Sequence, residues 1–178
     1  MFKALIATLG VALVTSATAQ AQSQPYAAFG DRPIKALSAD DIAGLRAGRG
    51  MAMALPAELN RYPGPMHVLE HAAALNLTPE QKDQLTRQID TMRTAAISLG
   101  EQIIARESAL DTLFRSGAAN VEAIDRITSE IAALYGQLRA VHLRTHLATR
   151  ASLTEIQQAQ YQTLRGYDAM AANPTHKH

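Results

Sequence analysis

The sequence contains no cysteine and no tryptophan among its 178 residues. The absence of cysteine excludes disulfides, iron–sulfur clusters, thiolate zinc sites and cysteine nucleophiles. Aromatic residues make up only 4% of the chain, although hydrophobic residues, among which alanine is the commonest, make up 47%. Helix-on-helix packing suits this composition better than a β-sandwich or a β-barrel does. We therefore expect an all-α protein of one domain with a thin core.

Long apolar runs are also scarce, and the clearest one, at residues 4–14, lies close to the N-terminus. Lys3 precedes this run, and small residues follow it. The pattern predicts a secretory signal peptide over residues 1–21, cleaved after Ala19 or Ala21. An uncleaved membrane anchor is the weaker alternative, because the run is shorter than the ~20 residues of a spanning helix. We therefore expect a periplasmic protein.

The chain also lacks a large excess of positive or negative charge. Cleavage of the signal peptide removes Lys3 and leaves equal numbers of basic and acidic residues. A neutral exported chain lacks the electrostatic footprint of a nucleic-acid-binding protein. No serine–histidine–acid arrangement, glycine-rich phosphate loop or H-E-x-x-H zinc motif stands out in the sequence. We therefore expect no nucleic-acid partner and no enzymatic activity.

Proline and glycine divide the rest of the chain into segments. Residues 22–61 are expected to form a flexible N-terminal arm. A marginal helix begins in this arm at the N-cap Ser38 and runs to its end, although three glycines weaken it. The Tyr-Pro-Gly-Pro sequence at residues 62–65 is a clear break. We expect a four-helix domain over residues 64–167, followed by a disordered tail at residues 168–178.

Two capped motifs frame two long amphipathic helices. Residues 77–81 (LTPEQ) and 153–157 (LTEIQ) each place a threonine N-cap three residues before a glutamine, which is a capping box. Apolar residues recur at alternating spacings of three and four over residues 79–114, and again after the N-cap Asn120, as in a coiled-coil seam. The short connection at Gly117 forces the two helices into an antiparallel hairpin.

Four of the six histidines form two pairs spaced four residues apart, His67 with His71 and His142 with His146. On a helix, such a pair lies on one face and can present two ring nitrogens to one metal ion. The first pair lies in a short helix expected over residues 66–75, and the hairpin brings the second pair to the same end of the fold. We therefore expect one shared site for a divalent transition metal, Zn, Ni, Co or Cu. Coincidental pairs on solvated helix flanks are the alternative.

Oxygen-bearing side chains near the pairs are candidates to complete this metal site. Glu70 follows His67 by three residues and can orient its ring or join the ligands. Asp90 and Gln88 fall near the mirror position of His146 across the hairpin. The sequence leaves open whether Glu70 or Asp90 supplies a carboxylate.

The two LTxxQ motifs and the hairpin between them resemble the periplasmic family that includes the Spy and CpxP chaperones and the ZraP and CnrX metal sensors. The resemblance covers about residues 64–167, and it implies four helices, usually a dimer of interlocked hairpins, and no enzymatic reaction. Sensors of the CnrX type bind nickel or cobalt through an H-x-x-x-H pair on the first helix and an H-x-x-x-M pair late in the third. Here His67 and His71 match the first pair. His142 begins the second, in which His146 replaces the methionine.

The resemblance implies two functions that the sequence leaves open. The first is a metal-responsive protein with a membrane-bound signalling partner; the glutamate that the sensors use on their second helix falls here at residues 88–90 (Gln-Ile-Asp). The second is a metal-independent chaperone that holds unfolded client proteins on an apolar and basic surface. Arg139, Arg144 and Arg150 are candidates for such a surface, although solvated arginines are common on helices. A homodimer is expected in both cases.

Overall fold

The computed structural model describes residues 26–167; the predicted signal peptide and the predicted tail lie outside the described residues. Every regular element within residues 26–167 is a helix, which confirms the all-α prediction. The chain divides into two units, and the described part of the first contains one short 3-10 helix, η1 (Ala27–Phe29). The second unit begins at Asp31 and contains helices α1 to α6. None of the described helices has the length and hydropathy of a membrane span.

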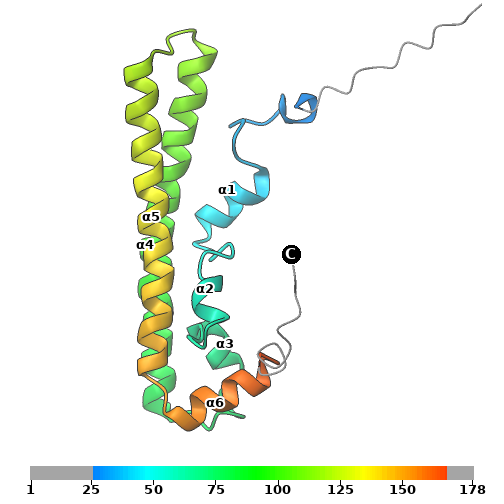
Figure 1. Ribbon diagram of the computed structural model, residues 1–178, viewed down its shortest axis with the longest axis vertical. Helices are drawn as coiled ribbons and strands as arrows, with labels where there is room; N and C mark the ends of the chain where they lie inside the picture. The colour runs from blue at the N-terminus through cyan, green and yellow to red at the C-terminus, as the bar shows by residue number, and fades with distance from the viewer. Residues whose placement is uncertain (1–25, 168–178) are drawn as a thin grey trace, which may run out of the picture. The chain divides into compact units, whose positions relative to one another are not determined.

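Two long helices, α4 (Pro79–Arg115) and α5 (Val121–Ala151), form the predicted antiparallel hairpin (Figure 1). Each begins at the predicted N-cap: the side chain of Thr78 accepts a hydrogen bond from the α4 backbone, and Asn120 does the same for α5. Gly117 lies in the turn with φ at 72°, the left-handed region that favours glycine. At 1.5 Å per residue, the 37 residues of α4 span about 55 Å.

The chain before the hairpin packs against it. α1 (Ala39–Arg46) lies so close to α4 that a Cβ atom added at Gly100 would lie 2.3 Å from the carbonyl oxygen of Leu45. Leu45 is only 1% exposed. The buried residues of this core are Ile34, Leu37, Leu45, Ala96, Ile103, Ile104 and Leu138. Interpreting residues 22–61 as a flexible arm therefore does not fit their later part, which contributes to the core.

The expected helix from Ser38 to residue 61 is wrong, because the chain forms two short helices there. α1 begins at the predicted cap Ser38, with a complete capping box, but ends at Arg46. The chain then turns through residues 47–54 before α2 (Leu55–Glu58). Three residues of the turn have positive φ angles, Gly48 (63°), Met51 (44°) and Ala52 (62°). A continuous helix would carry this segment away from the hairpin, whereas the turn keeps it in contact.

Two shorter helices lie near the open end of the hairpin (Figure 1), α3 (Pro65–Glu70) and α6 (Glu155–Leu164). The predicted helix over residues 66–75 stops at Glu70, and the chain continues in turns to Asn76, whose φ is 49°. A second core joins both helices to the start of α4. Its buried residues are Val68, Leu75, Leu77, Leu85, Leu153 and Tyr161.

The two LTxxQ motifs form the predicted capping boxes and also bond to each other. The amide nitrogen of Gln81 donates to the amide oxygen of Gln157 at 2.9 Å, and the amide nitrogen of Gln157 donates to the amide oxygen of Gln81 at 3.1 Å. The same nitrogens reach the carbonyl oxygens of Ser152 and Leu75, respectively. Each glutamine therefore caps its own helix and links the start of α4 to the start of α6.

Candidate functional site

Two of the four predicted metal ligands line one cavity near the open end of the hairpin. The cavity has a volume of about 180 Å³, and its titratable lining groups are His67, His146 and Glu58. The other lining residues are apolar or glycine and belong to residues 50–55. The cavity therefore brings α2, α3 and α5 together around two imidazoles and one carboxylate.

His146 is fixed by the loop that precedes α3. Its Nδ1 atom lies 2.7 Å from the carbonyl oxygen of Tyr62. A carbonyl oxygen only accepts hydrogen bonds, so Nδ1 carries the hydrogen and the neutral ring keeps its lone pair on Nε2. A Cβ atom added at Gly64 would lie 3.2 Å from that Nε2 atom and 3.0 Å from Cε1. The glycine of the Tyr-Pro-Gly-Pro break therefore lets this loop pack against the ring.

His67 is held in the same way. Its Nδ1 atom lies 2.9 Å from Oε2 of Glu70, as the spacing predicts, and this hydrogen bond is the main cause of the lowered pKa of Glu70. Because an ionised carboxylate only accepts, Nδ1 again carries the hydrogen and Nε2 keeps the lone pair. Histidines that bind metals commonly have their second ring nitrogen held by an oxygen in this way.

The sequence predicts that His142 borders the hairpin seam, and the structure buries its side chain beneath the turn that follows α1. Its side chain is 3% exposed, and its Nε2 atom has no hydrogen-bond partner among the described residues. Burial, and next the nearby His146, lower the pKa of His142, so that the neutral ring is favoured. A Cβ atom added at Gly50 would lie 3.8 Å from its Nδ1 atom. The side chain is buried because the turn after α1 covers this flank of α5.

His71 does not line the cavity. It is the C-cap residue of α3, and its ring meets that of Tyr161 edge-on at 6.5 Å between centroids. Its backbone N–H still donates to the carbonyl oxygen of His67 at 3.3 Å, so the helical spacing is kept, but its ring lies against Tyr161 and not in the cavity. Within residues 26–167, no three His, Asp or Glu side chains are grouped closely enough to hold a metal ion. The shared four-histidine site therefore stays a prediction.

Neither of the two α4 residues considered as oxygen donors lines the cavity. Asp90 is exposed on α4. Gln88 instead bonds to the end of α5, where its oxygen accepts from Thr149 at 3.2 Å and its nitrogen donates to Ser152 at 3.1 Å. Gln88 therefore faces Thr149 and Ser152 on α5, a few residues beyond His146, which the turn predicts as its mirror position.

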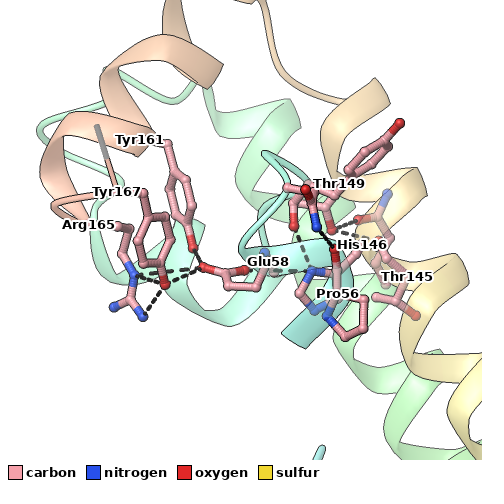
Figure 2. Close-up of polar contacts among 12 residues, drawn as sticks. Pro56, Glu58, Thr145, His146, Thr149, Tyr161, Arg165 and Tyr167 are labelled. Carbon is pink, nitrogen blue, oxygen red and sulfur yellow. Dashed lines mark hydrogen bonds and ion pairs between the residues drawn. The ribbon is translucent and has the colours of Figure 1, made fainter. Parts of the chain in front are cut away.

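The carboxylate beside His146 is Glu58, which the sequence analysis missed (Figure 2). Glu58 is 7% exposed, and its Oε2 atom lies 3.6 Å from Nδ1 of His146. Oε2 also accepts the backbone N–H of Gly64 at 2.9 Å. Oε1 accepts the hydroxyl groups of Tyr161 at 2.5 Å and Tyr167 at 3.1 Å. We call Glu58 and these four partners, together with Arg165, the Glu58 cluster.

Arg165, the C-cap residue of α6, places a positive charge beside Glu58. Nε of Arg165 lies 3.7 Å from Oε1 of Glu58. Burial, and next the hydrogen bond to Glu58, raise the pKa of Tyr161, so that its hydroxyl remains a donor at ordinary pH. The only sequence signal for this cluster is an acidic residue that follows an apolar Leu-Pro-Ala stretch. All of its partners except Gly64 lie far away in the chain, which is why local patterns do not reveal it.

Comparison with known proteins identifies one family. Residues 66–165 match the sequence profile described as LTXXQ motif family protein. This match covers more than half of the chain and includes both capped motifs and all four paired histidines. No curated protein and no solved structure shows significant similarity to the chain.

Proposed function

The chain belongs to the LTXXQ motif family, the family of Spy/CpxP-type periplasmic proteins, and from this premise we propose that it is an exported, metal-responsive protein. The proposed ligand is a divalent transition metal, Zn, Ni, Co or Cu. It would bind first to His67 and His146 at the cavity between α2, α3 and α5. These ligands suit the proposal because imidazole nitrogen binds all four metals well.

One observation carries this proposal. The rings of His67 and His146 line the same cavity, and each has its Nδ1 atom held by an oxygen atom while Nε2 keeps a lone pair. Both rings are therefore oriented as metal-ligating histidines commonly are. The neutral, buried His142 lies next to the cavity wall at Gly50 and supplies a third imidazole nearby.

The proposed response to metal arises because two further candidate ligands, His142 and Glu58, lie near the cavity but are held by other contacts. The segment around Gly50 lies against His142, and Glu58 is engaged by Gly64 and Tyr161. Recruiting His142 or Glu58 as a further ligand requires these contacts to change. Metal binding would then rearrange residues 50–58 against α5, and we propose that a membrane-bound partner reads this change.

Calorimetric titration of the mature chain with each of the four metals tests the proposal. The double substitution His67→Ala/His146→Ala should weaken binding about 100-fold or more, because it removes both oriented ligands. The matched control is His176→Ala/His178→Ala in the C-terminal tail, which should leave binding at the cavity unchanged. Equal affinity of the wild type and the His67/His146 variant would contradict the site.

Single substitutions separate the contributions of the other two histidines. The structure predicts that His142→Ala weakens metal binding more than His71→Ala does, because His142 adjoins the cavity and His71 faces Tyr161. Metal ligation requires neutral imidazole, so affinity should fall below about pH 6.5. Equal losses in both variants would instead support the four-histidine site predicted from the sequence.

We propose client holding as the second candidate function, and a groove on the hairpin supports it. The groove has a volume of about 440 Å³ between α4 and α5, where Met92 and Val141 lie beside Arg87 and Arg144. This mixture of apolar and basic surface fits the chaperone reading, whereas Arg139 and Arg150 do not line it. Suppression of the aggregation of reduced lysozyme by metal-free protein tests it. Met92→Asp should abolish suppression, and His67→Ala/His146→Ala should not affect it.

A further inference from the structure

A separate cavity of about 660 Å³ lies where the end of α5 and the first turns of α6 meet the loop at residues 61–62. It is lined by neither His67 nor His146. Its volume falls within the range of small-molecule binding sites. The charged groups, the unpaired donors and the apolar wall of this cavity together indicate what it binds.

The charged groups of the cavity leave one net positive charge. They are Arg61, Arg150 and Glu155. Arg150 is held in place, because its Nε donates to the side-chain oxygen of Gln158 at 3.1 Å and its guanidinium carbon lies 4.4 Å from the ring centroid of Tyr62. Arg61 has no hydrogen-bonding or ionic partner in the part of the chain that the structure describes.

A buried amide in the cavity lining also lacks a partner. Gln162 lines the cavity and is only 5% exposed, and its Nε2 atom has no hydrogen-bond partner among residues 26–167. Buried donors are nearly always paired, and an unpaired one is unfavourable. Together with the guanidinium group of Arg61, this amide gives the cavity donors that lack acceptors among the described residues.

The remaining wall is apolar. Leu147, which is 58% exposed on α5, lines the cavity with Leu153. Ala151, Ala159 and Tyr62 also line the cavity. A ligand that fits this wall has an apolar body next to its polar group.

We propose that this cavity binds a small organic monocarboxylate with an apolar body. The carboxylate accepts from Arg61 and Arg150, whose planar guanidinium groups match its two oxygens. The apolar body covers Leu147 and the ring of Tyr62. A single negative charge neutralises the net charge of the cavity, whereas a phosphate dianion would leave it with a net negative charge beside Glu155. This proposal does not depend on metal binding, because its residues are not the metal ligands.

The test uses 4-phenylbutyrate as the probe, titrated into the full mature chain and followed by NMR. We expect saturable binding with a dissociation constant of about 1 mM, as a ligand of roughly a dozen non-hydrogen atoms allows. Arg61→Gly should weaken it about tenfold, the loss of one charge-assisted contact. Arg61 has a φ of 68°, so glycine fits its backbone and the variant should fold. Ala159→Trp, on an exposed face of α6, should block the cavity without removing a donor.

The controls define the outcomes that would overturn the proposal. Arg139→Ala removes an exposed α5 arginine outside the cavity and should leave probe binding unchanged. The neutral 4-phenylbutyramide and inorganic phosphate should each bind at least about tenfold more weakly than the carboxylate. The proposal fails if the probe does not saturate, if amide or phosphate binds equally well, or if Arg61→Gly and Ala159→Trp both bind as the wild type does.

Discussion

The burial of His142 makes the stability of the folded protein depend on pH. Its ring is buried, and its pKa lies below the ordinary value of 6.5 because charging it would require hydration that the core does not provide. Below that value the unfolded chain takes up a proton that the folded chain does not. Stability is therefore complete above about pH 6.5 and falls as the pH drops toward the lowered pKa of the folded state.

The substitution His142→Leu should remove this dependence. Leucine fills the site without a titratable group, so the free energy of unfolding should fall less on going from about pH 7.5 to about pH 5.5 than in the wild type. Urea denaturation at the two pH values measures the difference. The matched control His67→Leu changes a half-exposed histidine and should retain the wild-type dependence. If both variants behave alike, the burial of His142 is not the cause.

Among the substitutions considered, loss of the Glu58 side chain should lower the free energy of unfolding most. In Glu58→Ala, the N–H of Gly64 and the hydroxyl of Tyr161 remain buried without their acceptor. We expect a loss of about 3 kcal/mol in the free energy of unfolding, measured by urea denaturation. The control Glu101→Ala removes an exposed carboxylate 3.3 Å from Arg46 and should lose less than about 1 kcal/mol.

The residues that could be predicted from the sequence are those with local partners. The bond between His67 and Glu70 follows from their spacing of three on one helix. The partners Glu58 and Tyr161 lie 103 residues apart, and no local pattern joins them. Similarly, the burial of His142 depends on the chain around Gly50 packing over it, which the periodicity of α5 does not contain.

Among the elements, the starts of helices were predictable and their ends were less so. A start is determined by a cap within four residues, and the side chains of Ser38, Thr78, Asn120 and Thr154 all cap as their sequence context predicts. The early ends of α1 and α3 depend on contacts with other elements. For α1, the decisive contact is the close approach of Leu45 to α4, which keeps the following turn beside the hairpin.

This approach gives a prediction for two glycines on the long helices. Gly100→Ala places a methyl group against the backbone of Leu45, so α1 must shift, and we expect a loss of about 2 kcal/mol in the free energy of unfolding. Gly136→Ala, where an added Cβ meets no atom within 4 Å, should instead stabilise α5 by about 0.5–1 kcal/mol. Urea denaturation of both variants checks the opposite signs. Equal effects would mean that α1 does not contact α4 so closely.

For the whole molecule, the interlocked motifs explain why glutamine stands at the same place in both. A glutamate could complete a capping box, but only an amide can both donate and accept in the reciprocal bonds of Gln81 and Gln157. The hairpin and the meeting of its ends were predictable from the periodicity and the short turn. The bond between the motifs was not, because each motif taken alone explains its own glutamine as a cap.

A double-mutant cycle measures this link. Gln81→Ala and Gln157→Ala should each destabilise the protein, and the double variant should lose less than the sum of the two, with a coupling of about 1–2 kcal/mol. The comparison pair is Thr86→Ala with Thr128→Ala, two exposed threonines that each bond only to their own helix. This pair should be additive within about 0.5 kcal/mol. Additivity of the glutamine pair would show that the reciprocal bonds contribute nothing.

The long sequence separation within the Glu58 cluster also bears on how the molecule opens. A short turn joins the two helices of the hairpin, whereas the contact between Glu58 and Tyr161 closes a loop of about a hundred residues. Closing the longer loop costs more conformational entropy. Native-state hydrogen exchange should therefore reveal a partial opening in which the amide of Gly64 exchanges while the amides in the middle of α4 stay protected. If both exchange only by global unfolding, the cluster and the hairpin form a single cooperative unit. A metal bound at the adjacent cavity would slow the exchange of Gly64 first.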